Sequence, residues 1–222
     1  MKKIKMLIGI ALMSASAFAT ASITSVNSPT GRATFGSTDV IDWSSLGPSQ
    51  TPVASPFSIS SGGGIAATVS KPSGGFERRD QPNGWGGNFT DGSSLLWTAG
   101  SIVGAVDVTF GSLISGFGFQ INPDNSDTLT TVDIFDIANS LLVSFSLTTN
   151  DRSQPSASFI GFTSDMTDIS RFTVRQNGFN DFAINQLSLI TVGSSNVPEP
   201  TSIALLGLGL LGFAASRRKS AK

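Results

Sequence analysis

The side chains that most often perform catalysis are missing from this chain. It contains no His and no Cys among its 222 residues, which excludes Ser-His-Asp and Cys-His nucleophiles, the common zinc sites and iron–sulfur ligation. Lys71 is the single Lys between the two terminal regions, and it precedes Pro72 in a stretch rich in Gly, Ser and Pro. That composition predicts a loop, so we do not expect a Ser-Lys dyad.

Paired carboxylates are the remaining route to catalysis, as in glycoside hydrolysis. The chain has fifteen acidic residues, so some pair at a suitable distance is expected by chance. The segment Glu77-Arg78-Arg79-Asp80 contains opposite charges, which predict internal ion pairs on a solvated loop. We therefore predict that the protein is not an enzyme, with a glycan hydrolase as the weakest alternative.

Oxygen-bearing side chains gather in one short polar segment. Asn122, Asp124, Asn125 and Asp127 offer the hard oxygen ligands that Ca²⁺ prefers, although the EF-hand spacing and its turn glycine are absent. The alternative is a polar turn in which Asn and Asp side chains accept hydrogen bonds from their own backbone. Ca²⁺ is the one cofactor that the sequence suggests.

Trp85 is the second candidate for binding. It lies between glycines in Gly84-Trp85-Gly86-Gly87, and flanking glycines would let an exposed indole lie flat against a sugar ring. The alternative places Trp85 in the hydrophobic core, because buried aromatic side chains dominate core energetics. Trp43 and Trp97 stand beside aliphatic neighbours, and we predict that both are core residues.

Period-two alternation of apolar residues predicts the strands that must position these candidates. Val106, Val108 and Phe110 alternate with polar residues, and Phe117, Phe119 and Ile121 are in phase. The pattern predicts a hairpin of 131–137 and 141–148 around the turn 138–140. The full set of predicted strands is 102–110, 114–121, 131–137, 141–148, 158–163, 169–176 and 182–192.

Seven or more short strands at this spacing predict an all-β fold, an antiparallel two-sheet sandwich over residues 22–192. Residues 24–64 are less regular and are expected to wrap the edges of the sandwich. Because there is no Cys, no disulfide supports the fold. Stability must come from the packing of the sheets.

The N-terminus has the features of a secretory signal peptide over residues 1–21. Lys2, Lys3 and Lys5 precede an apolar stretch, and small residues follow with two A-x-A sites. Residues 20–200 then hold seven basic and fifteen acidic residues, a net charge of −8. This negative charge disfavours binding to nucleic acid.

A rigid box follows the predicted sandwich. Residues 193–197 form a short polar linker. The box consists of Val197, Pro198, Glu199 and Pro200, and its two prolines fix φ and lack a donor N–H, so neither a helix nor a strand continues through it.

An apolar segment and a basic tip complete the C-terminal region. Residues 201–216 carry no charge and predict a short transmembrane helix. This segment is shorter than the roughly twenty residues of a comfortable bilayer crossing. Arg217, Arg218 and Lys219 follow at once and would hold this end in the cytoplasm.

The order of box, apolar helix and basic tip over 197–219 resembles the PEP-CTERM sorting signal of exported bacterial proteins. The resemblance implies an inner-membrane-anchored precursor that an exosortase processes near the box and passes to the cell surface or extracellular matrix. The stretches 38–43, 84–89, 95–97 and 182–185 are similar to those of other proteins of this group, whose members are thought to form jelly-roll-like sandwiches.

These observations lead to three functional hypotheses. The first is a structural or adhesive protein of the exopolysaccharide or biofilm layer. The second is a carbohydrate-binding module for exopolysaccharide, with Trp85 as the platform. The third is a glycan hydrolase that uses two Asp residues.

Overall fold

A computed structural model describes residues 22–28, 30–100, 104–124, 126–150, 155–178 and 181–191. The predicted signal peptide (1–21), linker (193–197), box, apolar segment (201–216) and basic tip (217–219) lie outside these residues. Within the described ranges, no helix has the length and apolar character needed to cross a membrane.

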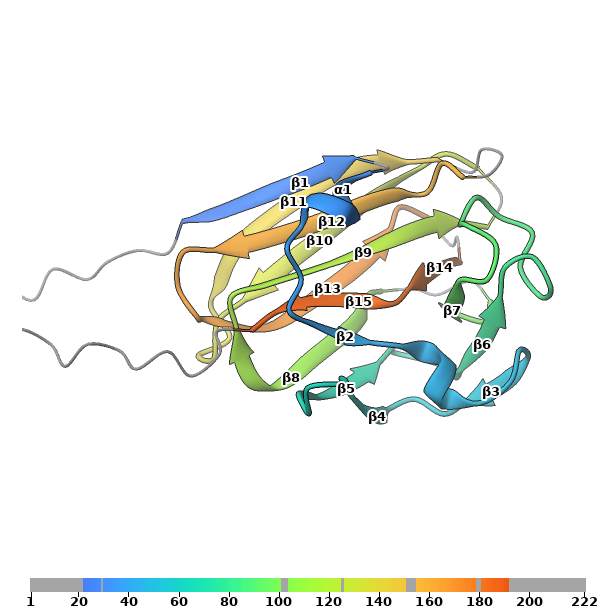
Figure 1. Ribbon diagram of the computed structural model, residues 1–222, viewed down its shortest axis with the longest axis horizontal. Helices are drawn as coiled ribbons and strands as arrows, with labels where there is room; N and C mark the ends of the chain where they lie inside the picture. Colours follow the sequence, from blue (N-terminus) through green and yellow to red (C-terminus); the bar gives the residue numbers. More distant parts are fainter. Residues whose placement is uncertain are drawn as a thin grey trace, which may run out of the picture.

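Two antiparallel sheets face each other and form the body of the protein (Figure 1). Sheet A contains β1 (Ile23–Ser28), β2 (Asp39–Ile41), β3 (Thr51–Val53), β6 (Phe76–Asp80), β7 (Ser94–Trp97), β9 (Gly116–Pro123), β12 (Ser158–Ser164), β14 (Phe182–Asn185) and β15 (Leu187–Ile190). Sheet B contains β4 (Phe57–Ser60), β5 (Ala66–Ser70), β8 (Val106–Ile114), β10 (Thr128–Phe135), β11 (Leu141–Thr149) and β13 (Ile169–Gln176). The predictions of an all-β fold and of two antiparallel sheets are confirmed.

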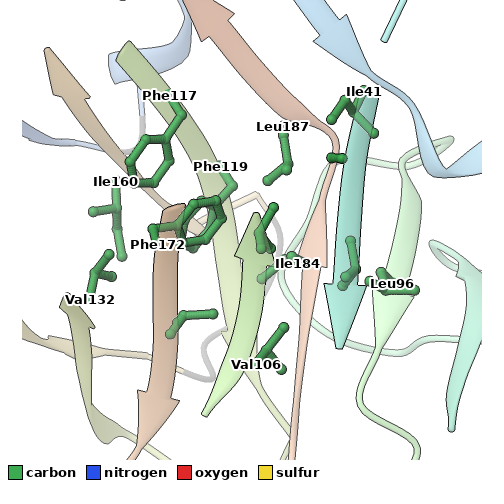
Figure 2. Close-up of a cluster of buried hydrophobic side chains, with 14 of the residues drawn as sticks. Ile41, Leu96, Val106, Phe117, Phe119, Val132, Ile160, Phe172, Ile184 and Leu187 are labelled. Atoms are coloured by element: carbon green, nitrogen blue, oxygen red, sulfur yellow. The ribbon is translucent and has the colours of Figure 1, made fainter. Parts of the chain in front are cut away.

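The hydrophobic core lies between the sheets, as the alternation of apolar residues predicts. Phe117 and Phe119 project from β9 toward Phe172 of β13 (Figure 2). The rings of Phe117 and Phe172 stack with centroids 4.2 Å apart, and both side chains are fully buried. Stacked aromatic rings and aliphatic neighbours thus join sheet A to sheet B.

The predicted hairpin is confirmed, and its turn has a clear cause. Strands β10 and β11 pair in antiparallel register from Thr128↔Thr149 onward. Asn139 adopts a positive φ of 63° in the turn, which Asn tolerates better than most residues. The Asp136 side chain accepts a hydrogen bond of 2.7 Å from the Ser140 N–H and closes the turn.

The loop predicted at Glu77-Arg78-Arg79-Asp80 is wrong. The segment from Glu77 to Asp80 lies in strand β6 and not in a loop. Its ion pairs, Arg78–Asp80 and Arg79–Glu77, are present because residues two apart share one face of a strand.

The predicted strand 182–192 is divided into β14 and β15 at Gln186. The break occurs where the strand changes partners. Strand β14 pairs with β7 and β9, whereas β15 pairs with β2 and β9.

Residues 24–64 contribute strands to the edges of both sheets, as expected, together with two short helices. These are α1 (Gly31–Thr34) and the 3₁₀ helix η1 (Trp43–Leu46). The Trp43 side chain is fully buried in the core, and its Nε1 donates to the Asn185 carbonyl at 2.8 Å. The core position predicted for Trp43 is confirmed.

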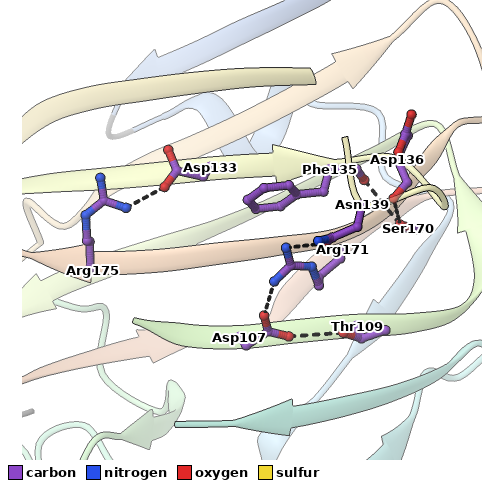
Figure 3. Close-up of polar contacts among 9 residues, drawn as sticks. All are labelled: Asp107, Thr109, Asp133, Phe135, Asp136, Asn139, Ser170, Arg171 and Arg175. Carbon is purple, nitrogen blue, oxygen red and sulfur yellow. Dashed lines mark hydrogen bonds and ion pairs between the residues drawn. The ribbon is translucent and has the colours of Figure 1, made fainter. Parts of the chain in front are cut away.

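The outer face of sheet B carries ion pairs between neighbouring strands. Arg175 of β13 pairs with Asp133 of β10, and Arg171 of β13 pairs with Asp107 of β8 (Figure 3). Arg171 also lies 3.9 Å above the Phe135 ring. Opposite charges on adjacent strands stabilise the pairing that places them side by side.

Candidate functional site

The two binding candidates of the sequence meet in one small pocket. Trp85, Gly86 and Gly87 line it on one side, and Asn122 and Asp124 line it on the other. Its volume is about 200 Å³. The loop that carries Trp85 therefore closes over the end of β9, where the polar segment begins.

This pocket lies on the outer face of sheet A, away from the main core. Leu96 and Ile184 point into the main core, whereas their neighbours Leu95 and Ala183 belong to a second apolar cluster with Trp85. Because successive side chains of a strand point to opposite faces, the second cluster covers the outer side of the sheet. Trp85 and Phe89, both from the segment between β6 and β7, belong to this second cluster.

The expectation of an exposed indole platform at Trp85 is wrong. Only 7% of Trp85 is exposed, and its ring packs against Trp97 with centroids 6.1 Å apart. Its Nε1 donates to the Asn122 Oδ1 at 2.8 Å. A buried indole with a satisfied N–H is a packing residue, so only its pocket edge remains for contact with a ligand.

Gly87 is what brings Trp85 and Asn122 together. A Cβ at position 87 would overlap both the Asn122 Oδ1 and the Trp85 Nε1. At Gly86 the same atom would meet nothing within 4 Å. The glycine at 87 thus permits a close approach of the backbone to this hydrogen bond.

The core position predicted for Trp97 is also wrong. Trp97 is partly buried beside the second cluster on the outer face of sheet A. Its Nε1 donates to the Asp181 Oδ2 at 2.9 Å, and the Arg79 guanidinium lies 4.5 Å from its ring centroid. The Leu95-Leu96-Trp97 alternation explains this result, because only the middle residue faces the main core.

The described residues of the calcium hypothesis differ in burial. Asn122 is fully buried and oriented toward Trp85, whereas Asp124 and Asp127 are exposed. Asn125 lies outside the described residues. Within the described part of the chain, no group of three or more acidic side chains is placed to hold a metal ion. Calcium binding by this segment stays a prediction.

An asparagine network that the sequence did not reveal is connected to the pocket through Asn122. Asn88 is fully buried, and its Nδ2 donates to the Asn150 carbonyl and Oδ1, both at 2.9 Å. The Asn150 carbonyl also accepts from the Asn122 Nδ2 at 3.4 Å. Asn88 and Asn150 are 62 residues apart, so no local pattern could have marked them as a pair.

A second polar pocket of about 250 Å³ brings two carboxylates to one place. Asp42 and Asp91 line it together with Asn185 and neighbouring residues. The hydrolase hypothesis requires such a pair. However, the Asp42 Oδ1 accepts the Ser44 N–H at 2.9 Å and thereby caps η1, which is a structural role.

Asn185 joins this pocket to the fold through Arg32 of α1. Arg32 donates to the Asn185 Oδ1, to the Gln186 carbonyl and to the Ser188 Oγ. Burial lowers the pKa of Arg32 to about 10, so the side chain remains a cation at neutral pH. It fixes α1 to the break between β14 and β15.

The Lys71 side chain is held by contacts within the fold. Its Nζ donates to the Thr98 carbonyl and lies 5.2 Å from the Phe76 ring centroid. Burial lowers the pKa of Lys71, and the nearby Asp181 carboxylate opposes this effect. The ammonium group is thus held by a carbonyl and an aromatic face.

The decisive comparison concerns the C-terminal region. Residues 196–219 match the family model described as the PEP-CTERM protein-sorting motif. The chain carries a PEP-CTERM sorting motif. The match covers the predicted box, apolar segment and basic tip, and it is consistent with an exosortase substrate. A PEP-CTERM motif implies an exported, membrane-anchored precursor that is sorted to the surface.

The other comparisons do not extend this result to the sandwich. No curated protein matches the sequence significantly. Among solved structures, this chain is similar to the enzymatically active domain of tailspike protein 4 from bacteriophage CBA120. That likeness has 15% identity and a TM-score of 0.24, and it covers 64% of this chain and 19% of the tailspike chain. A TM-score this low carries no argument about fold or function.

Proposed function

We propose that this protein is an exosortase substrate with a structural or adhesive role at the cell surface or in the extracellular matrix. In this role the precursor is held in the inner membrane by residues 201–216. Processing near the box then releases the sandwich into the exopolysaccharide layer. The match of residues 196–219 to the sorting motif is the observation that carries this proposal.

The features of the sandwich support a role without catalysis. The chain lacks His and Cys, and the pair of Asp residues in the second pocket, Asp42 and Asp91, includes Asp42, which caps η1. The described domain is instead rich in packed aromatic rings and cross-strand ion pairs. Such a scaffold suits a protein whose task is to persist and to contact other matrix components.

Intact mass spectrometry of the protein recovered from the cell surface tests the proposal. We expect the mature chain to lack the residues that follow the box. Glu199→Ala should retain the tail and stay in the membrane fraction, because it removes the charged residue of the box. Ser195→Ala, just before the matched motif, is the matched control and should be processed normally. Mature protein that extends to Lys222 would identify a plain membrane anchor instead.

Recognition of exopolysaccharide is a second candidate function, which the Trp85 pocket favours. The pocket places the edge of an aromatic ring beside the Asp124 carboxylate and the backbone of two glycines. The lining of this pocket is mainly polar, and polar groups of this kind fix the orientation of a bound ligand.

Calorimetric titration of the processed protein with exopolysaccharide of the producing strain tests this second function. Asp124→Ala should abolish saturable heat, whereas Asp91→Ala in the other pocket should leave it unchanged. Repeating the titration with a chelator separates a direct sugar contact from one that depends on Ca²⁺. Equal binding by wild type and Asp124→Ala would exclude this pocket as the glycan site.

A further inference from the structure

The edge strands on one side of the sandwich differ in character from those on the other side. On one side lie β1 of sheet A and β11 of sheet B, and on the other lie β3 and β4 (Figure 1). Ring contacts between the sheets confirm this order. Phe145 of β11 packs 5.6 Å from Phe162 of β12, the neighbour of β1. Phe57 of β4 packs 5.6 Å from Phe76 of β6, the neighbour of β3.

The side with β3 and β4 is protected against pairing with other strands. These edge strands have three and four residues. Pro52 lies within β3, and Pro56 immediately precedes β4. Short strands and prolines are the usual means by which proteins keep sheet edges from associating.

The opposite side lacks these protections. Strand β11 has nine residues, with the sequence LLVSFSLTT, and β1 has six, with the sequence ITSVNS. Neither strand contains a charged residue, a Pro or a Gly. The charged residues of sheet B instead sit on the inner strands, where Asp133 and Asp107 are paired (Figure 3). Such an edge presents a row of backbone donors and acceptors to another strand.

We propose that β11 pairs in antiparallel orientation with β11 of a second copy of this chain, so that sheet B continues across a two-fold axis. A row of backbone N–H and C=O groups is satisfied best by another strand edge. A two-fold contact places β11 against β11 of the second copy, so a charged residue in this strand would face a like charge. Strand β11 contains no charged residue. Leu141, which is 56% exposed, would be covered by the partner.

The pairing of β11 with β10 is irregular between Leu141 and Val143, so the alignment is centred on Phe145, within the regular part of the strand. Ser144 of one copy then lies opposite Ser146 of the other. Both serines are exposed, so they lie on the outer face of the sheet, where substitution leaves the core intact. Directly opposed residues in such a pair have Cβ atoms about 4.5–5.5 Å apart, close to the separation of about 3.5–4.5 Å in a disulfide.

Cysteine cross-linking tests this dimer directly, because the natural chain has no Cys. The full chain, with its own signal peptide and sorting motif, is produced with Ser144→Cys and Ser146→Cys. Intact cells are treated with a mild oxidant, and the products are analysed by non-reducing electrophoresis and mass spectrometry. The matched control is Ser58→Cys with Ser60→Cys. These are also alternating exposed serines, on the protected edge strand β4 of the same sheet.

We expect a reducible species of twice the chain mass for the β11 variant and none for the β4 variant. The absence of a covalent dimer in the β11 variant would overturn the proposal. Equal dimer in both variants would do the same, since it would reflect random collision. A cross-link to a protein of another mass would show that β11 pairs with a different partner. The result does not depend on processing near the box, because precursor and mature protein carry the same strand.

Discussion

The indole N–H of Trp85 donates a 2.8 Å hydrogen bond to the side-chain oxygen of Asn122, across 37 residues of sequence. This bond joins the loop over sheet A to the end of β9 and defines one side of the Trp85 pocket. It also fixes the positions of the two residues that the sequence offers as binding candidates. Trp85 is held by Asn122, and Asn122 is oriented by Trp85.

We expect this bond to be measurable as a coupling free energy. Trp85→Phe removes the N–H and with it the hydrogen bond to the buried Asn122 side chain, which should lower the free energy of unfolding by about 0.5–1.5 kcal/mol. Asn122→Ala should cost a similar amount. The double variant should cost less than the sum, by roughly 1 kcal/mol, because the two residues are in contact. Urea unfolding of the four proteins measures this, and strict additivity would contradict the coupling.

Gly87 and Gly86 should respond differently to the same substitution. Gly87→Ala forces its new methyl group against Asn122 and Trp85, and overpacking of this kind typically costs about 1–3 kcal/mol. Gly86→Ala has open space around the new methyl group and should change stability by less than about 0.5 kcal/mol. Thermal unfolding of the two variants compares them. Similar midpoints would show that the loop adjusts freely.

The aromatic stack between the sheets should contribute most to stability. Phe172 is fully buried against Phe117, and Phe172→Ala should lower the free energy of unfolding by about 3–5 kcal/mol. Met166→Ala is the control, because Met166 is 43% exposed and its truncation leaves no cavity. Chemical denaturation of both variants measures the difference. A loss below about 1 kcal/mol at Phe172 would mean that the neighbouring rings repack.

Asp39 should make stability sensitive to acid. Burial raises the pKa of this carboxyl, but hydrogen bonds from the Ser61 hydroxyl and from the Gly63 and Val40 N–H groups outweigh burial and lower it. Because the folded pKa is lowered, the stabilisation is complete above the unfolded pKa of about 3.9. It is lost as the pH falls through the folded pKa.

Asp39→Asn should therefore destabilise the protein at neutral pH and progressively less below about pH 4. Free energies of unfolding at several pH values, for wild type and variant, give the difference curve. A difference that stays constant from neutral to acid pH would show that the charge of Asp39 has no part in its role.

The sequence by itself determined those features that depend on residues close together in the chain. Strand β13 begins and ends at the predicted residues 169 and 176, because Phe172 and Val174 alternate with polar residues, which marks a strand with one buried face. The sorting motif at residues 196–219 was equally visible, since its box, apolar segment and basic tip are contiguous.

Only the tertiary structure decided which distant segments meet. It buried Trp85 against Trp97, paired it with Asn122 and moved Trp97 out of the main core. It also placed β1 beside β11 at one open side of the sandwich. The physical reason is that these outcomes depend on contacts between residues far apart in the chain. No local periodicity records such contacts, and glycines such as Gly87 allow a loop to take the one path that forms them.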